Sequence, residues 1–259
     1  MATPPDMRTW GLLTPADLAR PLVISPHLDD AVLGCGHLLA ACPGTTVATV
    51  FAGRPDAYPD PPERWDGVCG FGPGDEVHAA RRAEDAAALA VLDAAPVWLD
   101  AVEHSHLERA RPWGGAALVE ALEAVLDAVD PTIVLAPFGL GNPDHDATHR
   151  VAMRVRARRP DPVWCCYQDL GYHLIPGLLA HRVAQLFVAG SWPTPVAPPF
   201  APDPARKTAA LACYPTQLRA LEAEWGLSAK LESPEQYWRL DAPPAGWEGL
   251  ATGPAIGLG

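Results

Sequence analysis

Continuous apolar runs alternate with stretches of helical spacing along the first half of the chain. The continuous runs are typical of strands buried on both faces of a parallel sheet, and they are residues 21–25, 46–51, 96–99 and 132–136. Apolar side chains recur at helical spacing in residues 31–42, 75–92 and 115–129. This alternation predicts a βαβ series and therefore an α/β fold, with a Rossmann-like, mostly parallel, doubly wound sheet flanked by helices.

The second half of the chain continues this pattern less regularly. We expect a helix at 147–157, strands at 163–167 and 183–189, a Pro-rich extended segment at 192–204, a helical region at 207–225 and a Pro/Gly-rich tail from Asp241. Residues 1–259 are therefore expected to form a single domain, with a core at about 20–190 and a smaller C-terminal extension at about 191–259.

The composition argues against two classes of binding partner, nucleic acids and membranes. The net charge is −12 and the pI about 5.1, so the basic surface that nucleic-acid binding requires is missing and we expect no nucleic-acid partner. No uncharged run reaches the roughly 18 residues that cross a bilayer. The N-terminal residues MATPPDMRTWGLLTP have neither the basic start nor the long apolar core of a signal peptide. We therefore expect a cytoplasmic protein with no membrane partner, and a homo-oligomer is left open.

The cysteines give no sign of a structural site. None of the six forms a C-x-x-C pair, and Cys165 and Cys166 are neighbours on an expected strand, so their side chains point to opposite faces. Neither a thiolate zinc site nor a disulfide framework is indicated.

The segment Ser25-Pro26-His27-Leu28-Asp29-Asp30 lies where the first strand ends and the first helix begins. Polar side chains at such a turn fit a site at the carboxyl edge of a parallel sheet. His27 and Asp30 offer an imidazole and a carboxylate, both good zinc ligands, and Asp29 is a second carboxylate that can take a proton. The alternative is that Asp29 and Asp30 only cap the helix, which leaves His27 without a role.

A second loop, residues 139–145, follows the strand at 132–136 and should lie at the same edge of the sheet. Its His145 completes a set of two histidines and one aspartate. Three protein ligands leave zinc one position for water, as in catalytic sites. Alternatively, His145 is an ordinary residue near a helix start. His149, within the first turn of that helix, is better explained as structural or as a residue that supports a ligand.

Two further segments carry candidate substrate contacts. Residues 53–74 form a long loop rich in Pro, Gly and Asp, a length often found in lids and binding loops. Its Trp65 either meets a polar, ring-shaped ligand or pins the loop to the body. In the helix at 75–92, Arg81 lies on an otherwise apolar stripe, which indicates that this end overlooks a polar cavity. The alternative is a solvated salt bridge between Arg81 and Asp85.

The segment 25–30, together with Asn142-Pro143-Asp144-His145, resembles the signature of the PIG-L/LmbE zinc-dependent N-deacetylases. The resemblance extends through Cys35-Gly36 and residues 81–85 and 207–217, and so covers most of the chain. That family includes enzymes that deacetylate N-acetylglucosaminyl inositols, bacillithiol and mycothiol precursors, and sugars on antibiotics.

The resemblance implies a role for each of these positions. His27, Asp30 and His145 would bind zinc, Asp29 would be the general base, and Arg81 would help to hold the polar substrate. One position differs from the family, which usually has a histidine three residues before the last ligand to stabilise the developing oxyanion. This chain has Asn142 there, which can donate a hydrogen bond but adds no positive charge.

We therefore expect a Zn²⁺-dependent hydrolase that removes an N-acetyl group from an amino-sugar conjugate of the N-acetylglucosaminyl type. Its partner would be a small-molecule N-acetylated sugar or glycoconjugate, positioned by Arg81 and Trp65. Two alternatives are a zinc amidase of secondary metabolism that acts on a larger acyl group or a non-sugar amide, and a non-catalytic binding protein with the same fold. The intact set of His27, Asp29, Asp30 and His145 argues against the binding protein.

Overall fold

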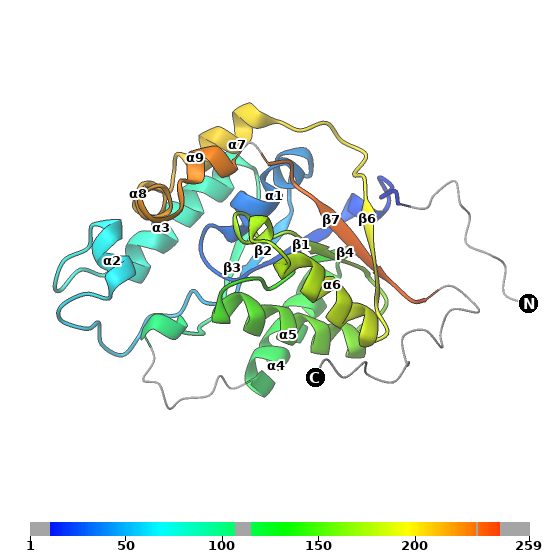
Figure 1. Cartoon of the computed structure of the whole chain (residues 1–259), viewed down its shortest axis with the longest axis horizontal. Helices are drawn as coiled ribbons and strands as arrows, with labels where there is room; N and C mark the ends of the chain where they lie inside the picture. The colour runs from blue at the N-terminus through cyan, green and yellow to red at the C-terminus, as the bar shows by residue number, and fades with distance from the viewer. Residues whose placement is uncertain (1–10, 107–114, 232, 244–259) are drawn as a thin grey trace, which may run out of the picture.

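The computed structural model of the chain has a single mixed sheet with helices on both faces (Figure 1). The structure describes residues 11–106, 115–231 and 233–243. Its strands are β1 (Pro21–Ser25), β2 (Thr46–Thr49), β3 (Ala95–Trp98), β4 (Ile133–Pro137), β5 (Val163–Tyr167), β6 (Trp192–Val196) and β7 (Tyr237–Asp241). Its α-helices are α1 (Asp30–Ala41), α2 (Arg64–Cys69), α3 (Val77–Val91), α4 (Gly115–Val129), α5 (Pro143–Arg158), α6 (Leu178–Val188), α7 (Pro204–Leu211), α8 (Pro215–Trp225) and α9 (Leu227–Lys230).

The strand order is β3-β2-β1-β4-β5-β7-β6. The first five strands of this order are parallel, and β7 runs antiparallel to both β5 and β6. The predicted mostly parallel, doubly wound α/β sheet is confirmed. The winding reverses between β1 and β4, and the crevice at the carboxyl ends of such neighbouring strands is where open α/β sheets bind ligands.

Alternating strand residues supply two cores. Val23 and Leu135 face a cluster that includes α1, α3 and α7. Leu22, Ile24 and Val134 face the other side, where α4, α5 and α6 pack (Figure 1). Because the central strands are covered on both faces, they are apolar at nearly every position, which is the pattern that predicted them.

Three predicted elements differ in the structure. The predicted strand at 183–189 is wrong, since residues 183–188 lie in helix α6 and Ala189 is its C-cap. A short apolar run alone does not distinguish helix from strand, and here Leu179, Val183 and Leu186 pack on the core at helical spacing. The loop at 53–74 contains α2. Helix α5 begins at Pro143 instead of residue 147, because Asn142 caps it and proline suits its first turn.

Three further expectations concern membrane-spanning helices, the cysteines and the C-terminal tail. Within the described ranges, no helix is both long and apolar enough to span a membrane. All six cysteines are free thiols, and Cys165 and Cys166 face opposite cores, as expected. The predicted tail begins in β7, and its residues from 244 onward lie outside the described residues.

The C-terminal part of the chain clamps a kink in α1. Cys35, in the middle of α1, has non-helical dihedral angles. In an unbroken helix the His37 N–H would donate to the Leu33 carbonyl, so the kink leaves these two backbone groups in need of other partners. Lys207 Nζ donates to the Leu33 carbonyl at 2.7 Å, and the His37 N–H donates to Glu235 at 2.9 Å. Lys207 and Glu235 also bond to each other at 2.6 Å, so one buried ion pair satisfies both freed backbone groups.

Lys207→Met should therefore destabilise the protein by about 3–5 kcal/mol, because it leaves the Glu235 carboxylate buried and unpaired. Urea or thermal unfolding followed by circular dichroism measures this loss. The matched control is Arg54→Met, which breaks an ion pair whose two side chains are 54% and 55% exposed and should barely move the midpoint. Equal unfolding midpoints for the two variants would show that the Lys207–Glu235 ion pair does not stabilise the fold.

Candidate metal centre and active site

The turn after β1 is built by local hydrogen bonds. Ser25 Oγ donates to the His27 carbonyl at 2.7 Å and accepts from the Ala31 N–H at 2.9 Å, which joins the strand end to the start of α1. The His27 N–H donates to Asp30 Oδ2 at 2.9 Å. These bonds hold His27, Asp29 and Asp30 in place at the carboxyl edge of the sheet.

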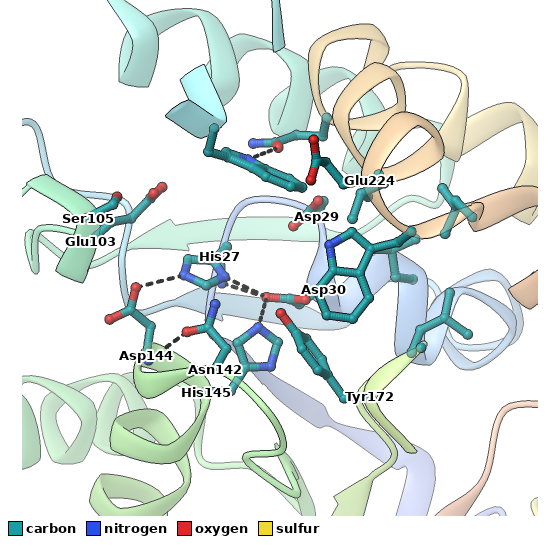
Figure 2. Close-up of a pocket in the computed structure, with 18 of the residues that line it drawn as sticks. His27, Asp29, Asp30, Glu103, Ser105, Asn142, Asp144, His145, Tyr172 and Glu224 are labelled. Atoms are coloured by element: carbon teal, nitrogen blue, oxygen red, sulfur yellow. Dashed lines mark hydrogen bonds and ion pairs between the residues drawn. The ribbon is translucent and has the colours of Figure 1, made fainter. Parts of the chain in front are cut away.

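His27, Asp30 and His145 come together as the sequence predicted, although His145 lies on α5 and not in a loop (Figure 2). Asp30 Oδ2 lies 3.1 Å from His27 Nδ1 and 3.2 Å from His145 Nε2. One donor atom from each residue lies within 4.8 Å of the others. Two imidazoles and one carboxylate at this spacing fit a divalent transition metal and leave room for a water or substrate ligand.

Two carboxylates that the sequence analysis did not assign support the histidines. Asp169 Oδ1 lies 2.6 Å from His145 Nδ1, and Asp144 Oδ2 lies 3.0 Å from His27 Nε2. Each occupies the ring nitrogen that faces away from Asp30, as the outer carboxylates of metal-bound histidines do. The available signal for Asp169 was its position just beyond the end of β5, at the edge that carries the other site residues.

Charge within this cluster controls its protonation. Burial opposes the charged form of His145, but Asp30 and then Asp169 outweigh it and raise the pKa of His145 to about 9. Burial likewise raises the pKa of Asp30, but His145 and His27 overcome this and hold it well below its usual range. Without a metal, the histidines thus take up protons to balance the carboxylates; a divalent cation can supply that positive charge instead.

Asp29 is 8% exposed and lines the same cavity. Its side chain makes no capping hydrogen bond to α1, so the interpretation of Asp29 as a mere helix cap is wrong. Burial, reinforced by the Asp30 carboxylate, raises the pKa of Asp29 to about 7. A bound cation would lower that pKa and favour the carboxylate, which can accept a proton.

Asn142 serves the fold and also faces the cavity. Its side-chain oxygen accepts from the Asp144 N–H at 2.8 Å and caps α5, immediately before Pro143. Because that oxygen is taken, the amide NH₂ is the group left to meet a ligand in the cavity. Figure 2 shows Asn142 beside His145 and below His27.

Arg81 lines the cavity, but its donors are largely occupied. The side chain is 1% exposed, with Nη2 donating to Asp66 at 2.6 Å and Nη1 to Glu103 at 3.1 Å. The predicted alternative, a solvated salt bridge to Asp85, is wrong. Asp85 is buried and accepts from Trp98 Nε1 at 2.7 Å and from the Tyr214 hydroxyl at 2.8 Å.

Trp65 lies on α2 and joins two elements. Its indole N–H donates to Gln217 on α8 at 3.1 Å, and its ring lines the cavity. It therefore pins its segment to the body of the protein and is also positioned to contact a ligand, so the two interpretations are compatible.

The cavity has a volume of about 390 Å³. The histidines and carboxylates line one part of the cavity, and a mainly apolar and aromatic wall adjoins them; Arg64, Glu224 and Lys230 also belong to the lining. That wall includes Trp65, Tyr172, Leu221, Trp225 and Leu227. Tyr172 packs edge-on against both His145 and Trp225, with ring centroids 5.3 and 4.7 Å apart. No sequence motif marked Tyr172 or Trp225, because only the folding of α8 over the sheet edge places Trp225 there.

Comparisons with known proteins find one family model and several similar structures. A family model described as GlcNAc-PI de-N-acetylase (PIG-L) matches residues 22–156. The structure resembles the A40926 pseudoaglycone deacetylase Dbv21, with 30% identity, a TM-score of 0.71 and coverage of 86% of this chain and 98% of that one. A deacetylase triple mutant (Orf2*T) involved in the teicoplanin biosynthetic pathway is also similar, with 26% identity, a TM-score of 0.68 and the same coverage.

A third structure is similar in fold alone. GalB, the 4-carboxy-2-hydroxymuconate hydratase from Pseudomonas putida, has 18% identity and a TM-score of 0.51, with coverage of 86% of this chain and 96% of that one. A comparison with curated protein sequences gave no match.

Asp169→Asn should weaken metal binding at the His27–Asp30–His145 cluster by about 10–100-fold, because the outer carboxylate orients His145 and increases its basicity. Competition with a chromophoric chelator measures the affinity. Asp161→Asn, on an exposed loop, is the control and should bind metal as the wild type does. An unchanged affinity in a folded Asp169→Asn variant would remove Asp169 from the centre.

Proposed function

The chain belongs to the GlcNAc-PI de-N-acetylase (PIG-L) family, and we propose that it is a zinc-dependent deacetylase that removes an N-acetyl group from an amino-sugar conjugate of the N-acetylglucosaminyl type. The observation that carries the proposal is the cluster of His27, Asp30 and His145, with Asp29 beside it in one cavity. An amide is a poor electrophile and water is a poor nucleophile at neutral pH, so an enzyme that hydrolyses amides must activate both the carbonyl group and the water.

His27, Asp30 and His145 would hold the zinc ion, which when bound polarises a carbonyl and lowers the pKa of water to about 7. Asp29 would accept the proton of the attacking water and return it to the departing amine. Asn142 would donate its amide N–H to the oxygen that becomes negative in the transition state. Asp144 and Asp169 would keep the two histidines in the orientation that ligation requires.

The remaining cavity residues would position the sugar and its conjugate. Because the donors of Arg81 bond to Asp66 and Glu103, we assign its contribution to orienting Glu103 at the cavity wall. Trp65, Tyr172 and Trp225 would stack on the apolar face of a sugar ring or on an aromatic group attached to it. Two similar structures are deacetylases of the A40926 and teicoplanin pathways, which supports a sugar carried on a glycopeptide aglycone as the substrate.

Acetate release from a panel of N-acetylated compounds tests this function. Zinc-loaded protein should deacetylate N-acetylglucosaminyl conjugates that carry a large aromatic group faster than free N-acetylglucosamine. Faster release of longer acyl chains would favour the amidase alternative. No release from any member by fully zinc-loaded, folded protein would favour the binding protein.

Asp29→Asn should retain zinc and lose about 10²–10⁴-fold in kcat, since the amide keeps the shape of the carboxylate but cannot accept a proton. Acetate release and metal content are measured on the same sample. His145→Ala serves as the contrasting variant, because it should lose the metal as well as the activity. Turnover of Asp29→Asn at the wild-type rate would require another base, and Asp144, which lines the same cavity, would be a candidate.

Asn142→Ala and Asn142→Ser separate the two roles of this residue. The alanine variant should lose about 1 kcal/mol through the missing cap, and about 10²–10³-fold in kcat with little change in KM through the missing donor. Serine caps a helix as well as asparagine does, but its hydroxyl is shorter than the amide. Serine should therefore restore the melting temperature and not kcat. Full recovery of kcat with serine would leave Asn142 only its structural role.

A further inference from the structure

A second group of side chains that could hold a metal ion adjoins the cavity, since one of its members, Glu103, also lines that cavity. His78 on α3, together with Glu103 and His106 of the segment that follows β3, offers one ligand atom each, all within 4.8 Å of one another. The two imidazole rings lie edge to face, with centroids 5.2 Å apart. His78 Nε2 lies 3.5 Å from Glu103 Oε1. None of these residues belongs to the His27–Asp30–His145 cluster.

Three of the four imidazole nitrogens in this second group are buried without a hydrogen bond. His78 Nε2 and both ring nitrogens of His106 have no such partner, although the two side chains are only 1% and 0% exposed. A buried polar atom without a partner costs about 1–3 kcal/mol, so several in one place call for an explanation. A metal ion is the ligand whose chemistry suits two neutral imidazoles and a carboxylate.

Neighbouring groups are arranged as they are around histidines that bind metals. The Tyr58 hydroxyl lies 3.4 Å from His78 Nδ1, which leaves Nε2 directed at Glu103. Asp66 Oδ2 lies 3.4 Å from His106 Nε2.

The local charge limits how tightly a cation would bind. Asp66 and Glu103 provide two negative charges, and Arg81, paired with both, removes one. Four carboxylates, Asp29, Asp30, Asp144 and Asp169, surround the first cluster instead. A divalent ion is therefore attracted to both places, but more weakly to the second.

We propose that His78, Glu103 and His106 form a second binding site for a divalent transition-metal ion such as zinc. A metal ion bound there would attach the segment 103–106 to α3, because His78 lies on α3 and the other two ligands lie in the segment. The backbone N–H of His104 in this segment donates to the Asp144 carboxylate at 3.1 Å, and Asp144 holds His27. Occupation of the second site thus steadies the residue that orients one ligand of the first.

Titration of the metal-free full chain with Co²⁺ and Zn²⁺ tests the proposal. Wild type should bind two equivalents, one tightly and one with at least tenfold lower affinity, and the cobalt form should show the absorption of two tetrahedral sites. His145→Ala should keep only the weaker site. A double variant, His78→Gln with His106→Gln, should keep only the tighter one. The second equivalent should raise the melting temperature of the wild type and not that of the double variant.

His104→Gln is the matched control, because this histidine is exposed in the same segment and its side chain is not in the cluster. It should still bind two equivalents. Saturation of the wild type at one equivalent, or a second equivalent that persists in the folded double variant, overturns the second site. Loss of the second equivalent in His104→Gln alone would assign it to surface histidines, and would overturn the proposal as well. None of these outcomes depends on whether the protein hydrolyses an acetamide.

Discussion

The parallel pairing of β1 with β4 is the constraint on which the whole site depends. Backbone hydrogen bonds join the two strands in one register, with Val23 opposite Leu135. The turn after β1 and the start of α5 therefore emerge side by side, although more than 100 residues separate them. His27, Asp29 and Asp30 come from one side of this junction, and Asn142, Asp144 and His145 from the other. Each half alone offers ligands too few for a stable metal site.

Electrostatics then explains why these side chains tolerate burial together. Four carboxylates and two imidazoles share a small volume, and isolated buried charges would be strongly unfavourable. The geometry offsets this cost because positive and negative groups alternate: each histidine lies between Asp30 and an outer carboxylate. The same alternation leaves an excess of negative charge for a metal ion to balance. Folding of this region and binding of the metal are thus expected to stabilise each other.

The C-terminal part of the chain completes both the sheet and the cavity. Strands β7 and β6 extend the sheet beyond β5, and Lys207 and Glu235 satisfy the backbone groups freed at the kink of α1. Helix α8 brings Gln217 and Trp225 to the cavity, where Gln217 holds Trp65 of α2. The side of the cavity with the candidate metal ligands therefore comes from the core of the fold, whereas the apolar and aromatic wall comes from α2, the segment after β5, α8 and α9.

The sequence by itself predicted the order of the strands up to β5 and of the helices between them except α2, because buried parallel strands and amphipathic helices have strong local signals. It also indicated the candidate metal ligands His27, Asp30 and His145, which the fold brings together. It also contained the cap of α5 at Asn142 and Pro143. It did not separate helix from strand at residues 183–189, where apolar content alone is ambiguous. Only the tertiary structure decided which carboxylates support His27 and His145, that Arg81 bonds to Asp66 and Glu103, and that His78 meets His106. Those contacts join side chains from separate elements, so they depend on packing distances that no local pattern encodes.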